Sequence, residues 1–203
     1  MAKTSGGVRG GGAKGNRSKL KSGSTEKGYT EKMKKNILGM EERIRNNRDE
    51  TAHVFDSKGN IVKSFAGKGA EVKIDIKGLP ENTIITHNHP SSIGEKGIMR
   101  IGNSFSGYDI ISAIRANAKE IRAKTPTYTF SLKRPKGGWG ITAKQAAISY
   151  NQIFDKIYGD MYKYVRKRNF SDTANDRARV TTHHNVIKEL SKKYGWNYSK
   201  KKG

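Results

Sequence analysis

The sequence predicts an α+β protein in which helices flank a mixed β-sheet, and two kinds of observation support this prediction. Four segments carry apolar residues at helical spacing, and the short alternating or β-branched runs between them are typical of strands. Their order along the chain is a helix, a strand meander, a strand, a helix, a strand and two closing helices. This order favours one α+β fold with a mixed sheet.

The first half of the chain contains one predicted helix and up to four strands. Apolar residues at every third or fourth position predict a helix over about 29–46. Alternating polar and apolar residues predict strands over 50–56, 61–66 and 71–76, and the turn residues between them indicate a meander of two or three antiparallel strands. The run Thr-Ile-Ile-Thr at 83–86 predicts a short buried strand.

The second half is predicted to be mainly helical. A polar, glycine-rich loop covers 90–105, and a helix should begin at Ser106. A strand is predicted over 128–132. Two helices over about 142–168 and 173–194 should close the chain.

Composition excludes several classes of protein. The chain has 203 residues, no cysteine and a formal net charge of +23. The lack of cysteine excludes a disulfide scaffold, a thiolate zinc site and a cysteine nucleophile. The basic excess favours contact with nucleic acid, because cationic surfaces bind polyanions by releasing counterions. No apolar run reaches membrane-spanning length and none resembles a secretory signal, so we expect neither.

Three regions are predicted along the chain. Residues 1–28 are rich in Gly, Ser and Lys and could bury almost nothing, so we expect a disordered basic arm. Residues 29–140 should form the α+β domain, and 141–203 a basic helical extension. The last part, 192–202, interleaves aromatic residues with lysine. It could stack on nucleic-acid bases, or its aromatic side chains could pack back onto the preceding helix.

Two histidines stand out at the end of the predicted strand 83–86. His87 and His89 are two residues apart, so on a strand both imidazoles project from the same face. Two imidazoles on one face can bind one metal ion, although such a pair can also be incidental at a solvent-facing strand end. The adjacent His183 and His184 lie on a predicted helix and point about 100° apart, which makes them poor joint ligands. We expect structural or surface roles for those two.

A serine and an aspartate open the helix that follows. Ser106 and Asp109 have the spacing of a capping box, in which the serine accepts from the backbone and the acid lies at the positive end of the helix. Such capping fixes the direction of both side chains. The same residues could therefore also serve a neighbouring metal ion.

These motifs, taken in order, resemble a known family. The JAMM signature of JAB/MPN metalloproteases, in its RadC-like form, is similar to two segments of this chain. They are Thr86-His87-Asn88-His89-Pro90-Ser91 and, after a spacer, Ser106-Gly107-Tyr108-Asp109. The stretch 50–134 also resembles the JAB-like domain of some phage minor head (head morphogenesis) proteins. Shared features there are the Phe-Asp-x-x-Gly turn at 55–59 and the Ser-Phe-Ser-x-x-Asp-Ile segment at 104–110.

The resemblance implies a set of site residues. His87, His89 and Asp109 would be zinc ligands, which leaves a fourth tetrahedral position for water. Glu50 would be the upstream glutamate that accepts the water's proton, and Ser106 would help to hold the oxyanion or the water. Two other acids, at positions 71 and 81, are alternatives for the base.

One departure from the family concerns the spacer. Sixteen residues separate His89 from Ser106, more than the family's usual spacing. The extra residues, about 94–103, can loop out at low entropic cost. They could then shape substrate access, or they could block the site.

Three functions follow as hypotheses. The first is a JAMM-like zinc hydrolase that cleaves a peptide or isopeptide bond, associated with a phage and located in the host cytoplasm or the virion. The second is an inactive JAMM-like structural protein of the virion whose basic arms contact DNA or a capsid or portal component. The third is a metal-dependent nuclease, suggested by the His-Asn-His triplet, but the spacing of Ser106 and Asp109 suits the JAMM arrangement better.

Deleting residues 1–28 tests the proposed DNA contact. Each phosphate contact that is lost should reduce the slope of log affinity against log salt by about 0.9. Fluorescence anisotropy of a short DNA duplex, titrated with the full and the shortened chain over a series of salt concentrations, measures that slope. An unaltered slope would place the DNA contact elsewhere on the chain.

Overall fold

The computed structural model describes residues 29–90 and 102–203. The described residues form four helices and one six-stranded mixed sheet, which confirms the α+β prediction. The predicted arm over 1–28 and most of the extra spacer residues lie outside the described residues.

The sheet has the strand order β2-β1-β3-β4-β5-β6. β3 and β4 are parallel, and every other neighbouring pair is antiparallel. Helix α2 connects the two parallel strands, as such a crossover requires. The strands are β1 (Thr51–Phe55), β2 (Ile61–Ala66), β3 (Ile84–Asn88), β4 (Glu120–Lys124), β5 (Tyr128–Lys133) and β6 (Asn197–Lys202).

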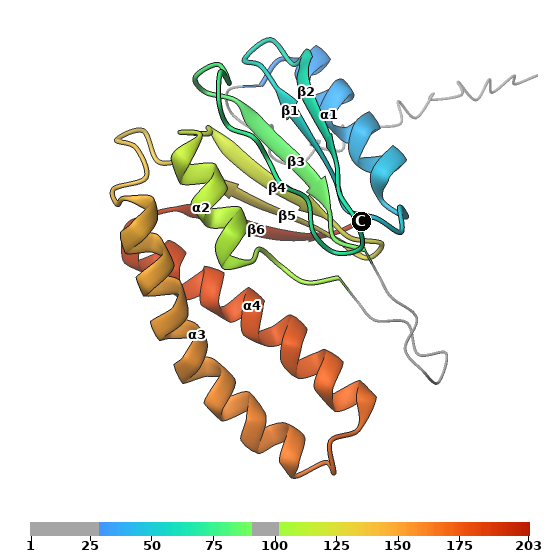
Figure 1. Cartoon of the computed structure of the whole chain (residues 1–203), viewed down its shortest axis with the longest axis vertical. Helices are drawn as coiled ribbons and strands as arrows, with labels where there is room; N and C mark the ends of the chain where they lie inside the picture. The colour runs from blue at the N-terminus through green and yellow to red at the C-terminus, as the bar shows by residue number, and fades with distance from the viewer. Residues whose placement is uncertain (1–28, 91–101) are drawn as a thin grey trace, which may run out of the picture.

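Helices cover both faces of the sheet (Figure 1). On one face, α1 packs Met33 and Ile37 against Phe55 and Ile84. On the other face, a larger core joins the strands to the remaining helices. Within the described residues, none of the helices is long and apolar enough to span a bilayer. The helices are α1 (Glu31–Ile44), α2 (Gly107–Arg115), α3 (Ala143–Arg166) and α4 (Asp172–Tyr194).

The central strand β3 is buried along its whole length, so both of its faces are occupied. Ile84 belongs to the core under α1, whereas Ile85 belongs to the core under the other helices. Successive side chains of a strand point to opposite faces. Thr86 accordingly donates from its hydroxyl to Glu41 of α1 at 3.2 Å, and His87 lies on the opposite face.

The predicted strand over 71–76 is wrong. The structure has only an isolated bridge between Lys68 and Glu71 there, so the meander contains two strands. The alternation in the sequence is real, since Val72, Ile74 and Ile76 are half-buried and the residues between them are exposed. The alternation arises because one side of an extended segment packs against the protein. The segment does not pair with any strand of the described sheet.

The sequence analysis did not predict β4 and β6. β4 places Glu120 and Arg122 at fully or almost fully buried positions, where a sequence reading expects apolar side chains. β6 lies in the lysine-rich segment 192–202, for which the sequence predicts no strand, and it pairs with the edge of β5. Its neighbour Trp196 is buried in the main core, so the C-terminal segment belongs to the fold.

A buried ionic network compensates the charges of β4. Arg122 donates to Glu120 at 2.7 Å and to Glu41 of α1 at 3.2 Å. Glu120 also accepts hydrogen bonds from Ser131 and from the hydroxyl of Tyr29. This network joins α1 to the two strands beneath it.

Replacing Arg122 with methionine tests the importance of the network. Arg122→Met removes the cation that Glu41 and Glu120 share and leaves Glu120 with the more distant Lys133, at 3.8 Å, so the free energy of unfolding should fall by about 3–5 kcal/mol. Urea unfolding followed by circular dichroism measures the change. The matched control Arg115→Met, on the exposed end of α2, should change stability by no more than about 0.5 kcal/mol. A similar small loss for both variants would contradict this account.

Candidate metal centre

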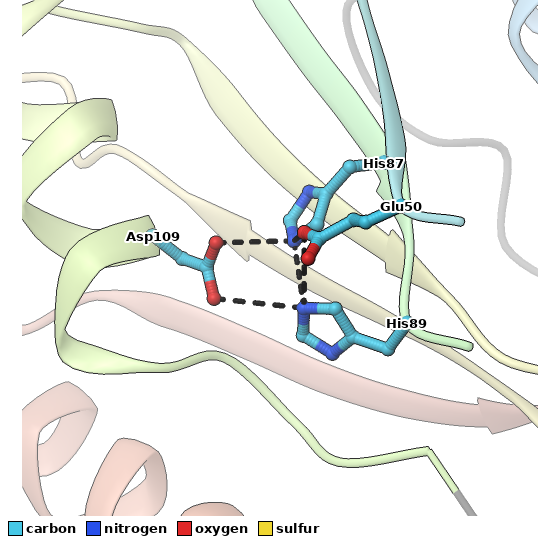
Figure 2. A group of neighbouring side chains, drawn as sticks. All are labelled: Glu50, His87, His89 and Asp109. Carbon is cyan, nitrogen blue, oxygen red and sulfur yellow. Dashed lines mark hydrogen bonds and ion pairs between the residues drawn. The ribbon is translucent and has the colours of Figure 1, made fainter. Parts of the chain in front are cut away.

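The end of β3 presents two imidazoles toward α2. His87 is the fourth residue of β3 and is fully buried. His89 is the first residue after the strand ends at Asn88. Their Nε2 atoms lie only 2.9 Å apart (Figure 2). The strand alternation expected from the sequence therefore places both rings on the same side.

The N-terminus of α2 supplies a carboxylate to the same point. Ser106 is the N-cap, and the capping box predicted with Asp109 is present. The backbone N–H and the hydroxyl of Ser106 donate to Oδ2 of Asp109 at 2.6 and 2.8 Å. These bonds fix the carboxylate so that its Oδ1 lies 3.1 Å from Nε2 of His87.

Glu50 reaches the cluster from the residue just before β1. Its backbone N–H donates to Gly69 and its carbonyl accepts from Gly67, which anchors the main chain at this point. A Cβ atom on Gly67 would lie 2.6 Å from that carbonyl oxygen, so only glycine fits there. The Glu50 Oε1 atom lies 3.8 Å from His87 Nε2 and 3.9 Å from His89 Nε2.

Asn88, between the two histidines, supports Glu50 from the opposite face of β3. Its side-chain oxygen accepts from the backbone N–H and the hydroxyl of Thr51, and its amide donates to the carbonyls of Asn47 and Asp49. The asparagine thus fixes the chain on both sides of Glu50. It contributes to the centre by positioning the glutamate.

The four side chains fit the requirements of a metal site. Their ligand atoms all lie within 4.8 Å of one another. Ligand atoms bound tetrahedrally at 2.0–2.1 Å are separated by about 3.3 Å. The two Nε2 atoms are 2.9 Å apart, Oδ1 of Asp109 lies 3.1 Å from His87 Nε2, and Oδ2 lies 3.6 Å from His89 Nε2, so these distances fall on both sides of that value. The cluster could therefore hold a metal ion, with Glu50 slightly farther out than the other three.

Hydrogen bonding also selects the ring nitrogen that faces the cluster. Nδ1 of His89 lies 2.7 Å from the carbonyl oxygen of Asn103. A carbonyl oxygen can only accept a hydrogen bond, so Nδ1 must carry a proton. A neutral His89 is therefore protonated on Nδ1 and has a lone pair on Nε2, directed at its partners. A backbone acceptor on the second nitrogen is typical of metal-binding histidines.

Burial and the neighbouring charges separate the two acids electrostatically. Burial raises the pKa of the Glu50 carboxyl, and the two histidines only partly oppose this effect. Burial alone would also raise the pKa of Asp109, but the charges and hydrogen bonds of His87 and His89 hold it well below its usual range. For His89, burial would lower the pKa, and the carboxylates of Asp109 and Glu50 reverse that effect. Asp109 thus stays ionised, as a ligand must, while Glu50 is shifted toward the range of a general base.

A cavity of about 530 Å³ opens beside the cluster. Glu50, His89 and Asp109 contribute to its lining, together with Ser106, the extended segment 70–74 and residues of α4. Of the two alternative bases, Glu71 lies on the cavity wall, whereas Glu81 is exposed in a turn outside it. The structure thus brings all five predicted site residues to this one place.

The sequence analysis missed His183, which lines the cavity from α4. Its Nδ1 lies 2.7 Å from the hydroxyl of Tyr150, and burial lowers its pKa to about 4, so the ring is neutral at pH 7. His184 points elsewhere and contacts the hydroxyl of Tyr198 at 2.8 Å. The two rings diverge as their helical spacing requires, but only the packing of α4 decides which one meets the cavity.

No family model, curated protein or solved structure matches this chain. The resemblance to JAB/MPN metalloproteases therefore stays a prediction that depends on the motifs themselves. The geometry of the cluster is independent of this resemblance, because it follows from the fold alone.

Removing both imidazoles tests whether the cluster binds metal. The variant with His87→Ala and His89→Ala should lose stoichiometric metal, because both nitrogen ligands of the cluster are gone. Elemental analysis after gel filtration measures the metal content per chain. The control His53→Ala removes a histidine of β1 whose ring bonds Ser64 outside the cluster, and it should retain the metal. Equal metal content in all three proteins would refute the assignment.

Proposed function

We propose that this chain is a zinc-dependent hydrolase of the JAMM type that cleaves a peptide or isopeptide bond. The observation that supports this proposal best is the convergence of His87, His89, Asp109 and Glu50 within 4.8 Å beside an open cavity. Two imidazoles and one carboxylate are a common ligand set of catalytic zinc. Three protein ligands leave a coordination position for a reactant.

The residues divide the chemistry among them. A zinc ion held here would polarise the scissile carbonyl and lower the pKa of a bound water. Glu50, with its raised pKa and its longer distances to the histidines, is placed to act as the base that would accept a proton from such a water and pass it to the leaving amine. His87, His89 and Asp109 hold their positions through the strand end and the helix cap.

Ser106 has a positioning role in this arrangement. Its hydroxyl donates to Oδ2 of Asp109 and accepts from the backbone N–H of the same residue. This bond orients the carboxylate ligand. The predicted donation to an oxyanion requires the Ser106 hydroxyl to leave Asp109 during the reaction, so it is proposed here as a second role.

Two sequence features support the alternative of an inactive structural protein, the net charge of +23 and the long spacer between His89 and Ser106. Lys200, Lys201 and Lys202 lie on the edge strand β6, where a polyanion could reach the exposed lysines. The buried cluster argues against a purely structural role. Burying two carboxylates and two imidazoles destabilises a fold. In a purely structural protein, apolar residues at these positions would give equal or greater stability.

A nuclease is the weakest of the three hypotheses. The His-Asn-His triplet does not act as a unit, because Asn88 faces away from the histidines and binds the chain around Glu50. The phage association, the capsid or portal partner, the nucleic-acid contact and the location in host cytoplasm or virion stay predictions from the sequence.

Substituting the proposed base tests the reaction. Glu50→Gln should retain about one zinc per chain but lower the rate of peptide cleavage by about 10²–10⁴-fold, since it removes proton transfer and leaves the ligands in place. Zinc-loaded protein is incubated with a pool of linear and lysine-branched peptides, and mass spectrometry measures the products.

The matched control is Glu71→Gln, which changes the other glutamate that lines the same cavity. It should cleave at nearly the wild-type rate. A chain that cleaves equally well after its metal is removed by a chelator would contradict the proposed function. Activity that survives in Glu50→Gln and disappears in Glu71→Gln would transfer the role of base to Glu71.

A further inference from the structure

A second, smaller cleft adjoins the metal cavity between helices α3 and α4. Its volume is about 250 Å³, and Arg179 and His183 line both spaces. The cleft walls are mainly aromatic and apolar, formed by Phe154, Tyr158, Tyr162, Val165, Phe170 and Ala178. The cleft therefore lies next to the metal cavity and shares two of its lining residues.

A series of stacked rings leads from the metal cavity into this cleft. Tyr150, whose hydroxyl contacts His183, stacks on Phe154 with ring centroids 6.1 Å apart. Phe154 stacks in turn on Tyr158 at 5.7 Å. Farther along the hairpin, Tyr162 meets Phe170 at 5.7 Å. The inner rings are packed in the protein, whereas Tyr158, Tyr162 and Phe170 are each about half exposed.

The position of Phe170 has a conformational cost. Its φ angle is +53° in the turn between α3 and α4, a region that bulky residues rarely adopt. A bulky residue in this conformation destabilises the fold, and residues of this kind are concentrated at functional sites. Glycine or asparagine would form this turn more easily. The phenylalanine instead places an aromatic ring on the wall of the cleft.

The geometry points to a substrate subsite: the α3–α4 cleft binds an aromatic or large aliphatic side chain of the peptide whose amide bond lies at the metal centre. This inference rests on the proposed function and specifies its substrate class. A volume of about 250 Å³ is below the 300–1,000 Å³ of a typical ligand pocket, so the cleft suits one side chain better than a whole ligand. Exposed apolar groups that line a groove mark binding sites of this kind.

The charges around the cavity favour a peptide over a nucleic acid, whose bases could also stack on these rings. The lining of the larger cavity includes three acids, Glu50, Glu71 and Asp109, and two cationic residues, Lys73 and Arg179. A polyanion that entered through the cleft would meet these acids. A peptide has uncharged backbone groups, for which the neutral His183 offers a hydrogen-bonding partner.

Two measurements test the subsite. The first is an NMR titration of the full chain with N-acetyl-L-phenylalaninamide, with N-acetyl-L-alaninamide as the small-side-chain comparison. Only the phenylalanine probe should shift ring signals of the cleft. The second is the cleavage profile of a peptide pool by the zinc-loaded chain, which should be enriched in aromatic or large aliphatic residues beside the cleaved bond.

The most informative variant is Phe170→Asn, because asparagine tolerates the positive φ angle and the fold should keep its thermal stability. It should weaken binding of the phenylalanine probe at least several-fold and reduce the aromatic preference of cleavage. Tyr162→Ala should act in the same direction. The control Tyr164→Ala removes a ring of the same helix that packs on Arg168 outside the cleft, and it should leave both measurements unchanged.

The outcomes separate this inference from the proposed function. Cleavage without side-chain preference, or a preference that Phe170→Asn leaves intact, overturns the subsite and retains the hydrolase. Probe binding in a chain that cleaves nothing keeps the cleft as a peptide-binding site but removes the hydrolase. Shifts in the cleft caused by a single-stranded oligothymidylate, without shifts caused by the phenylalanine probe, overturn the peptide subsite in favour of base stacking.

Discussion

Burying four ionisable side chains at one point is the constraint on which the rest of this structure depends. Two histidines and two acids, mostly shielded from water, are costly unless they compensate one another or bind a cation. Three kinds of anchor supply them: a central strand for both histidines, a capped helix for Asp109 and backbone hydrogen bonds to Gly67 and Gly69 for Glu50. The ligand atoms can meet only if these three anchors are correctly placed.

Successive side chains of β3 lie on opposite faces of the sheet, and the two faces have different roles. One face of the strand serves stability, where Thr86 joins the network of Glu41, Arg122 and Glu120 beneath α1. The opposite face carries the two histidines of the candidate metal centre. Asn88 connects the two, because it lies on the stabilising face and yet fixes the residues that flank Glu50. A one-residue slip of this strand would exchange all of these roles.

The C-terminal half also completes the site. Residues of α4 form a wall of the metal cavity, and β6 carries Tyr198, whose hydroxyl contacts Ser104 just ahead of the α2 cap at 2.8 Å. Figure 1 shows α3 and α4 as a long hairpin that extends beyond the sheet. The hairpin provides both part of the core and the aromatic cleft.

The sequence was sufficient to predict the features that depend on local pattern. The helix cap at Ser106, the shared face of His87 and His89 and most helices follow from spacing alone. β4 could not be predicted, because Glu120 and Arg122 are tolerated inside only through partners distant in sequence. The alternation over 71–76 indicated a strand that no neighbour pairs with. His183 reaches the cavity because of the way α4 packs, and this packing cannot be predicted from the residues near His183 in the sequence.

The central claim is that His87, His89 and Asp109 surround one divalent cation. X-ray absorption at the zinc edge of the zinc-loaded full chain tests it most directly, since that spectrum measures the ligand atoms and their distances. The account predicts a four-coordinate shell of nitrogen and oxygen at about 2.0–2.1 Å, with the outer-shell scattering of two imidazoles. A shell made of oxygen alone, or one in which no imidazole scattering is found, would contradict it.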